Sequence, residues 1–366
     1  MLTEEQKDAL ALYGVPGVGA RTYARLMERF GSPAAVFSAP KSALVETEGI
    51  GSAAAAHIHS FDRHGFVSDQ IRFMETCGAT LLTRSSEEYP KLLNTFRSAP
   101  PVLFVRGDPT VFGMPTVAVV GTRRPTDYGI KMTRMLVSGM IEAGMCVVSG
   151  MAVGIDSVAH SETLDRSGKT IAVFGCGVDV IYPTVNRKLA SDILRSGCLV
   201  SQFPMGTECR RGTFPARNAV IVGLSQGTVV VEAPIGSGAL ITADLTLRAG
   251  RKLFAVPGNI GSRTSAGTNN LFARGALPAC DSGAVLAGLG RAPRAGAPRS
   301  AIPKDIRPKP PGLSGDIVEL LRNGPMQLEL ICSTLGKPVA DILNELTYLE
   351  MDSYVIQRPG KVFEKA

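Results

Sequence analysis

Three arginines surround one phenylalanine in the segment RRGTFPARNAVIVGLS, residues 210–225. Arg210, Arg211 and Arg217 could each meet a phosphate group. Phe214 stands between them, just before an apolar helical stretch. Proteins hold single-stranded nucleic acid with basic side chains that contact the phosphates and with aromatic rings that stack on the bases. An alternative stays open, in which Phe214 belongs to the hydrophobic core and the arginines are solvated.

A second candidate site follows an apolar run, in the segment GTRRPTDYG, residues 121–129. Gly121 permits a tight turn, and Thr122 can donate a hydrogen bond. We expect Arg123 near the N-terminus of the next helix, where the dipole and free N–H groups attract an anion. The pattern predicts a phosphate contact at this turn.

A third motif is SGMAVGIDSVAH, residues 149–160, which also follows an apolar run. Ser149 and Gly150 begin a polar, open turn. Asp156 and His160 are four residues apart, so they share one face of a helix. They could form a catalytic pair or a structural hydrogen bond, and we favour the structural interpretation.

Two more loops could approach a ligand. EAPIGSGALITAD, residues 232–244, is a glycine–serine loop that opens a helix, and its N–H groups could cradle a phosphate. VPGNIGSRTSAGTNNL, residues 256–271, is a long polar loop that can close over a groove.

The templates of known enzymes fit this sequence poorly. GCGVDV, residues 175–180, begins like the dinucleotide fingerprint but ends in Val180. Cys176 has no evident base beside it, and the four histidines follow no metal-binding pattern. The seven cysteines form no C-x-x-C pair, which disfavours a zinc ribbon or a disulfide framework. We therefore predict no catalytic residues, no metal and no cofactor.

The candidate sites follow short β-branched runs that alternate with helical patterns over residues 78–288. Near-continuous apolar strands separated by helices are typical of a parallel sheet with helices on both faces. Ligands of such sheets lie at the carboxyl ends of the strands, so we expect one shared pocket. The runs are TVAVVG (116–121), MCVVSG (145–150), TIAVFG (170–175), CLVSQ (198–202), TVVVEA (228–233) and KLFAVPG (252–258).

Residues 1–75 are predicted to form a separate helical domain. GVPGVGARTYARLMERFGSP (14–33) and, later, EGIGSAAAAHIHSF each carry a glycine loop between helical stretches, the pattern of a helix-hairpin-helix. Gly17, Gly19 and Arg21 are candidate accessory DNA contacts, because glycine loops free N–H groups for phosphates. Arg21 also begins a stripe of three arginines at four-residue steps. The alternative is a plain packing unit with solvated arginines.

The C-terminal part is predicted to comprise a linker and a small domain. Residues 291–311 are basic and rich in Pro and Ala, a composition that cannot build a core. Residues 312–366 suggest three helices and a hairpin, a winged-helix arrangement. The third helix, PVADILNELTYLE, lacks Lys and Arg, so we expect a protein–protein or autoregulatory role rather than sequence-specific DNA reading.

The whole chain of 366 residues has 39 Lys and Arg against 32 Asp and Glu, a net charge of +7. A modest basic excess permits a polyanionic partner without requiring one. The charged N-terminus and the lack of a long apolar stretch argue against a signal peptide and a membrane span. We therefore expect a cytoplasmic protein.

In their order along the chain, these motifs closely resemble the DprA/Smf family of DNA-processing proteins. The resemblance rests on six segments: GTRRPTDYG, VVSGMAVGIDSVAH, TIAVFGCGVDVIYP, FPARNAVIVGLS, VVVEAPIGSGALITA and FAVPGNIGSRTSAGTNNL. It implies an extended Rossmann-like domain between a sterile-alpha-motif-like and a winged-helix domain. It also implies a dimer, through the Rossmann domain, that binds single-stranded DNA during natural transformation, protects it and helps to load the RecA recombinase, without catalysis.

The resemblance also implies roles for single residues. Arg123 would be the key phosphate contact, Arg211 a further basic contact, and Phe214 the aromatic that meets a base. The same pocket would be lined by Ser149, Gly150, Arg217, Asn218, Ser237, Gly238 and Thr242. Val153 and Gln202 depart from the family pattern, in which a basic and an acidic residue are frequent.

Two other functions remain open. A nucleotide-processing enzyme of the phosphoribohydrolase type would use a related fold, but APIGSGALITAD lacks the glutamate of that family's P-G-G-x-G-T-x-x-E loop. The third hypothesis is that the protein is a scaffold that bridges partners through its terminal domains.

Overall fold

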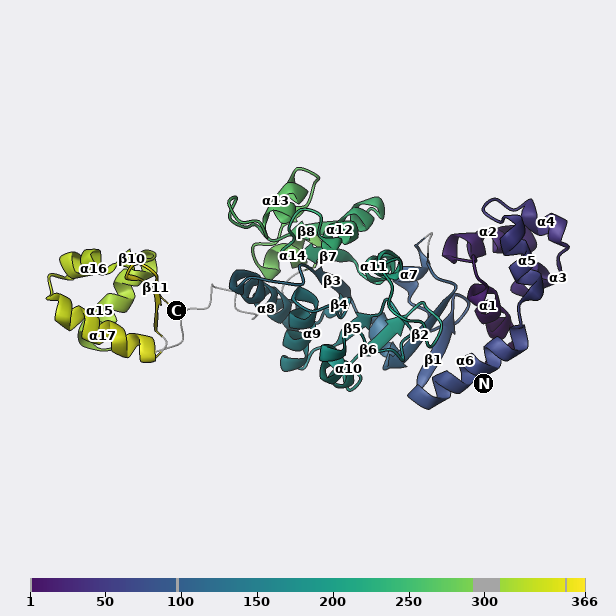
Figure 1. Cartoon of the computed structure of the whole chain (residues 1–366), viewed down its shortest axis with the longest axis horizontal. Coiled ribbons are helices and arrows are strands. Elements are labelled where there is room, and N and C mark those ends of the chain that lie inside the picture. The colour runs from purple at the N-terminus through teal and green to yellow at the C-terminus, as the bar shows by residue number, and fades with distance from the viewer. Residues whose placement is uncertain (1, 97–98, 292–309, 353, 366) are drawn as a thin grey trace. The chain divides into compact units, whose positions relative to one another are not determined.

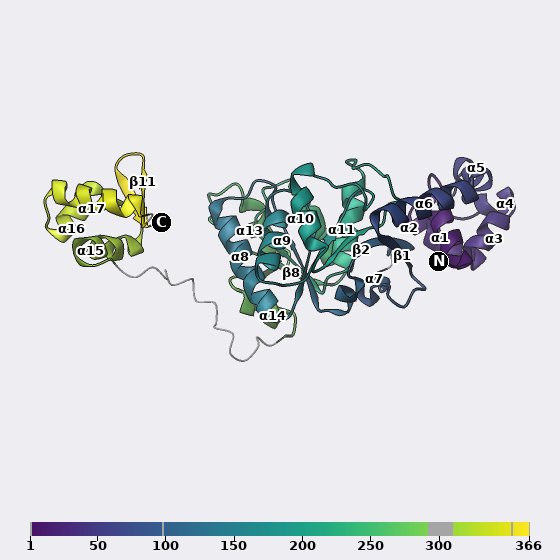
Figure 2. The same cartoon turned by 90° about the horizontal axis from the view of Figure 1, so that it is seen from below.

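The protein is described by a computed structural model, which covers residues 2–96, 99–291, 310–352 and 354–365 (Figures 1 and 2). It divides into two compact units, Met1–Ser300 and Ala301–Ala366. Most of the predicted linker, 291–311, lies outside the described residues.

The first unit is built on a nine-stranded sheet, counted over its described residues, with the order β1-β2-β6-β5-β4-β3-β7-β8-β9. From β6 to β9 all neighbours are parallel, whereas β2 pairs antiparallel with both β1 and β6. The α/β class predicted from the sequence is therefore confirmed. The strands are β1 (Ala79–Thr83), β2 (Val102–Gly107), β3 (Thr116–Val120), β4 (Cys146–Ser149), β5 (Thr170–Val173), β6 (Cys198–Ser201), β7 (Gly227–Val230), β8 (Lys252–Ala255) and β9 (Leu277–Pro278).

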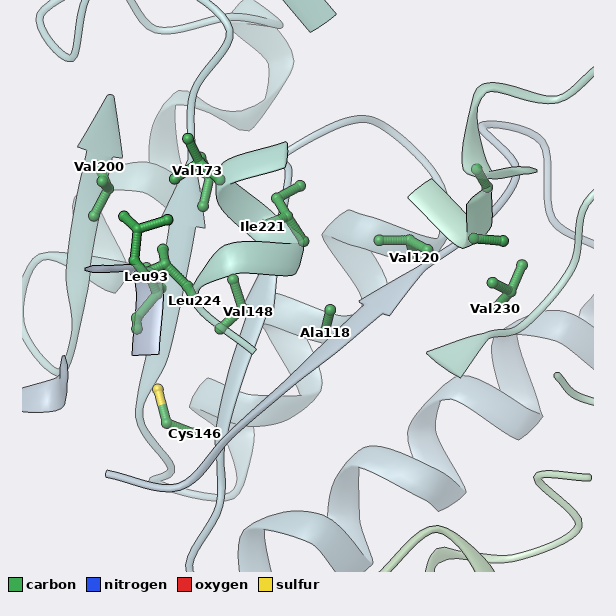
Figure 3. Packing of buried hydrophobic residues seen from close by; sticks show 14 of the residues in the cluster. Leu93, Ala118, Val120, Cys146, Val148, Val173, Val200, Ile221, Leu224 and Val230 are labelled. Carbon is green, nitrogen blue, oxygen red and sulfur yellow. The ribbon is translucent and has the colours of Figure 1, made fainter. Parts of the chain in front are cut away.

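Helices cover both faces of this sheet, which explains why its strands are apolar on both sides. Along β3, Ala118 and Val120 face one core cluster, while Val117 and Val119 face another. Figure 3 shows the first cluster, in which Ile221 and its helix pack on the strands. Figure 1 shows α8 and α9 on one side of the sheet and α11 and α12 on the other. The helices of this region are α7 (Lys91–Asn94), α8 (Asp127–Glu142), α9 (Ile155–Asp165), α10 (Arg187–Ile193), α11 (Thr213–Gly223), α12 (Gly238–Arg248), α13 (Ala266–Phe272) and α14 (Ser282–Gly288), with short 3-10 turns η1 (Pro109–Gly113) and η2 (Thr184–Asn186).

Residues 4–77 form helices that have a core of their own, around Leu26 and Leu44. They also share a second core with the sheet, in which Leu10 and Met74 pack with Phe104 of β2. Figure 2 shows α1 and α6 beside β1 and β2. These helices are α1 (Glu4–Gly14), α2 (Ala20–Phe30), α3 (Pro33–Ser38), α4 (Lys41–Val45), α5 (Ser52–Ser60) and α6 (Arg63–Cys77).

The second unit has an independent hydrophobic core that includes Ile317, Ile331, Leu346 and Phe363. Its sheet has the order β10-β12-β11 and is antiparallel. Its elements are α15 (Gly312–Leu320), η3 (Leu321–Asn323), β10 (Met326–Gln327), α16 (Leu328–Leu335), α17 (Val339–Met351), β11 (Val355–Arg358) and β12 (Val362–Lys365). Among the described residues of both units, no helix is both long and apolar enough to cross a membrane.

His160 is fully buried where α9 packs on the sheet. The Thr170 hydroxyl donates to the carbonyl of Val147 at 2.8 Å and so accepts from His160 Nδ1 at 2.7 Å. The other ring nitrogen, Nε2, has no hydrogen-bond partner among the described residues. Burial lowers the pKa of His160 to about 3, with a smaller contribution from Arg217, so the imidazole is neutral in the folded protein.

We predict that His160 makes the fold sensitive to acid. An unfolded histidine has a pKa of about 6.5, so between that pH and about 3 only the unfolded state binds this proton. The free energy of unfolding should fall with decreasing pH in this window, by about 1.4 kcal/mol per pH unit from this residue. The free energy of unfolding, measured with urea at several pH values from 7.5 to 5, should change less steeply with pH in His160→Asn than in the wild type. The exposed-residue control His64→Asn should keep the wild-type slope, and equal slopes in all three proteins would contradict the prediction.

Candidate nucleic-acid interface

Three loops at the carboxyl ends of β3, β4 and β5 meet the first turn of α11. They bring Arg123, Gly150 and Gly175 around the ring of Phe214. The groups enclose a hollow of about 60 Å³. Its lining residues are Arg123, Gly150, Ala152, Val153, Gly175, Tyr182, Pro183, Cys209, Phe214 and Arg217.

Phe214 is half-buried and belongs to none of the hydrophobic clusters of the described residues. The guanidinium carbons of Arg123 and Arg217 lie 5.5 and 5.7 Å from its ring centroid, within the range of a cation–π contact. A Cβ atom on Gly175 would come within 3.2 Å of the ring, so glycine leaves the ring its space. The ring is therefore held at the surface of the hollow, and not in the core.

Arg217 is buried, whereas both interpretations of its sequence context, a phosphate contact and a solvated side chain, place it at the surface. Its Nη1 donates to the carbonyls of Gly150 and Val173, the second at 3.1 Å, and its Nε donates to Asn218 Oδ1 at 2.9 Å. Burial lowers the pKa of Arg217, Asp156 opposes this shift, and Arg123 adds to it. The side chain thus fastens α11 to the loop after β4 and to the last residue of β5, and it lies beneath the phenyl ring.

Asp156 holds the same loop from the other side. Its Oδ2 accepts from the N–H groups of Gly150 at 3.2 Å and Ala152 at 3.4 Å. Burial raises the pKa of Asp156, and the charge of Arg217 and these hydrogen bonds oppose the rise. His160 bonds to Thr170 instead, so Asp156 and His160 form neither the catalytic pair nor the direct structural hydrogen bond that their spacing suggested. Each side chain has a structural role with a partner of its own.

Arg123 is exposed at the turn after β3. The N-terminus of α8 behind it is already occupied, which differs from our expectation of free N–H groups for an anion. Thr126 caps the helix by accepting from Gly129 N at 3.2 Å. The buried carboxylate of Glu232 accepts from the N–H and the hydroxyl of Thr126, at 2.9 and 2.6 Å. An anion at this turn would therefore depend on the Arg123 side chain itself.

The other predicted residues divide into two groups. Arg210 and Arg211 are exposed just before α11 and are not among the residues that line the hollow. Ser149 is buried and donates to the carbonyl of Val119 at 2.7 Å. Three residues lie at the start of α12, after β7, and do not line the hollow around Phe214: Ser237, which caps the helix, the exposed Gly238 and the buried Thr242.

The predicted accessory contacts lie in the turn between α1 and α2 and in the first turn of α2. Gly17 has a φ of +91°, which requires glycine at this turn, and Gly19 precedes the first residue of α2. Arg21 is exposed. The other two arginines of its stripe form ion pairs, Arg25 with Glu48 and Arg29 with Glu46, at 2.8 and 2.5 Å. The continuous basic stripe expected from the sequence is therefore partly neutralised.

Sequence reasoning missed Tyr182, which lines the hollow from the loop after β5. Its ring is 6.4 Å from that of Phe214, centroid to centroid. It also missed Asn186, whose Nδ2 donates to the carbonyl of Met151 at 2.8 Å and so braces the loop after β4. An aromatic residue in a loop after a strand was the only available signal for Tyr182.

We predict that Gly154 is essential to the shape of this edge. It has a φ of +88°, and an added Cβ would lie 2.4 Å from the carbonyl oxygen of Thr122. Gly154→Ala should lower the free energy of unfolding by about 1–3 kcal/mol or more. Gly212→Ala is the matched control, because an added Cβ there has no neighbour within 4 Å, and its effect should stay within about 0.5 kcal/mol. Equal urea midpoints for the two variants would count against this account.

Comparisons with known proteins agree with the motifs. The family described as DNA recombination-mediator protein A matches residues 80–289. Protein Smf of Synechocystis sp. is 32% identical over 404 aligned positions that cover 100% of both chains. The DNA processing protein DprA of Streptococcus pneumoniae is 40% identical over 188 residues, 51% of this chain and 66% of its own.

Two solved structures share the fold. The X-ray structure of DprA from Streptococcus pneumoniae has a TM-score of 0.68 and 30% identity, and covers 78% of this chain and 98% of its own. A structure of DNA processing protein A from Helicobacter pylori, described for its single-stranded DNA binding mode, has a TM-score of 0.51 and 30% identity, and covers 56% of this chain and 92% of its own. The match of the family over most of the α/β unit, and of a relative over the full chain, shows that this chain belongs to the DNA recombination-mediator protein A family, also called DprA/Smf.

Proposed function

We propose that this chain binds single-stranded DNA at the carboxyl edge of β3, β4 and β5 and acts as a recombination mediator, without catalysing a reaction. The observation that carries the proposal is the half-buried ring of Phe214 with the exposed Arg123 guanidinium 5.5 Å from its centroid. An aromatic ring that stacks on a base, next to a cation that contacts a phosphate, can bind a strand of any sequence. The single-stranded DNA binding described for the Helicobacter pylori relative supports this assignment.

The proposed contacts follow from which cations are exposed. Arg123, Arg210 and Arg211 reach solvent and would neutralise phosphates along the strand. Arg217 and Asn218 are buried, so their part would be to hold Phe214 and Gly150 in place. Ser149 would act in the same way from beneath, and the start of α12 around Gly238 would meet the strand farther along the edge.

The enzymatic alternative is disfavoured by the size of the hollow. Pockets for small molecules usually have about 300–1,000 Å³, whereas the space around Phe214 has about 60 Å³. A larger hollow of about 450 Å³ lies beside Glu232, but that carboxylate already accepts from Thr126 and Thr264. If the protein released a free base when incubated with nucleoside monophosphates, that result would favour the phosphoribohydrolase hypothesis.

We extend the proposal to partners with support from family membership. The chain would load the RecA recombinase onto the bound strand in the cytoplasm and would act as a homodimer through the Rossmann-like domain. Exposed apolar side chains on α12 and on the loops after β7 and β8, namely Ile235, Ile241 and Ile260, favour association at that end of the sheet.

The terminal regions would have accessory roles. The three helices and the β11–β12 hairpin of the second unit fit a winged-helix domain, and the exposed apolar residues Val339, Leu343 and Met351 of α17 suit a protein partner better than DNA. The turn around Gly17, with Arg21, would add a helix-hairpin-helix contact to DNA in a sterile-alpha-motif-like domain.

Binding should prefer single strands to duplexes, show little dependence on sequence and weaken steeply with salt. Each phosphate of a single strand that a side chain of the protein neutralises should contribute about −0.7 to the slope of log affinity against log salt concentration. Competition between single- and double-stranded oligonucleotides at several salt concentrations measures both quantities. Tight binding without salt dependence would overturn the proposal.

Arg123 and Phe214 should fail in different ways. Arg123→Ala should weaken binding by one to two orders of magnitude, since a charge-assisted contact contributes about 1.5–3 kcal/mol, and should make the salt slope shallower. Phe214→Ala should lose about 1–3 kcal/mol of binding with the salt slope unchanged. Arg195→Ala is the control, because this exposed arginine precedes β6 at the opposite edge of the sheet. If Phe214→Ala melts far earlier while its folded fraction binds normally, the ring is structural and its assignment is wrong.

A further inference from the structure

Tyr182 is the most exposed aromatic side chain of the hollow, with 47% of its surface accessible. The centroids of its ring and of Phe214 are 6.4 Å apart, and the two planes are inclined by 43°. Phe214 is approached from several sides, by Gly175, Arg123 and Arg217. Tyr182 lines the same hollow, so a base that approaches Phe214 through the hollow lies beside Tyr182 as well.

We propose that Tyr182 and Phe214 form an aromatic clamp that holds one base of the bound strand between their rings. This inference rests on the proposed binding of single-stranded DNA and adds a second stacking residue to it. Successive bases stack about 3.4 Å apart, so a base between two rings needs about 6.8 Å. At 6.4 Å and 43° the two rings form a tilted pair that is slightly closer than this value, so the tyrosine ring must turn and move outward to admit a base.

The segment that carries Tyr182 is anchored, although its ring is exposed at the surface. Asn186 N donates to the carbonyl of Pro183 at 3.0 Å. The Asn186 side chain donates to the carbonyl of Met151 at 2.8 Å and to Ser157 Oγ at 2.9 Å. The segment is thereby tied to the loop that Arg217 and Asp156 hold, so only the tyrosine side chain has to move when a base enters.

The clamp is suited to a strand of any sequence. Every base has a flat aromatic face, and stacking needs no match of donors and acceptors. The two arginines near Phe214 differ in exposure: Arg123 is free to meet the phosphate next to the clamped base, while Arg217 remains inside. Tyr182 would thus contribute affinity that does not depend on salt, whereas the neighbouring contact of Arg123 with a phosphate would weaken as salt increases.

The first test compares oligonucleotides with and without bases. Tyr182→Leu should bind oligothymidylate about 5- to 100-fold more weakly than the wild type, with an unchanged salt slope and an unchanged melting temperature. The difference from the wild type should disappear on an abasic oligonucleotide of the same length. Tyr348→Leu, an exposed tyrosine of the second unit with 65% of its surface accessible, is the matched control and should bind as the wild type does.

The second test uses the absence of tryptophan from the chain. Tyr182→Trp creates a single reporter whose fluorescence should be quenched by oligothymidylate and not by the abasic oligonucleotide, whereas Tyr348→Trp should respond to neither. Wild-type binding together with an unaffected Tyr182→Leu, or with an unquenched Tyr182→Trp, would overturn the clamp alone. A wild-type protein that binds no oligonucleotide would overturn the proposed function and the clamp with it.

Discussion

The candidate site depends on one buried guanidinium. Arg217 donates to the main-chain carbonyls of Gly150 and Val173, and so joins the first turns of α11 to two neighbouring strands of the sheet. A Cβ on Gly150 would lie 2.1 Å from Arg217 Nη1, so the contact requires glycine there. Phe214 lies three residues before Arg217 on the same helix, and the buried, hydrogen-bonded guanidinium supports its ring from beneath.

Burial of Arg217 and Asp156 has an energetic cost that hydrogen bonding must offset. Desolvation lowers the pKa of the arginine and raises that of the aspartate, while their mutual attraction opposes both shifts. Buried charges of this kind usually contribute little net stability, yet removal of one partner leaves the other uncompensated. We interpret the pair as a device that fixes one conformation of the loop after β4, which also contains Met151 at a φ of 62°.

The sequence predicted the strands from β3 to β8 well, because a strand buried on both faces must be apolar along its whole length, as Val117 to Val120 illustrate. It also identified the loops after β3 and β4 and the start of α11, but not the loop after β5, as parts of the site around Phe214. It could not reveal that Arg217 points inward, that Glu232 occupies the N-terminus of α8, or that Tyr182 stands beside Phe214. These facts depend on how separate loops pack in three dimensions, and no local pattern of residue types carries that information.

The helices at the N-terminus share a core with the sheet, through Leu10, Met74 and Phe104. Tilting α1 or α6 away from β2 would leave a void around a phenylalanine that has no solvent exposure, and such voids are costly. The helical region therefore behaves as a rigid extension of the sheet. If the turns of this helical region also contact a bound DNA strand, that contact lies at a fixed distance from the site around Phe214. The fold therefore sets the length of DNA that spans the two contacts.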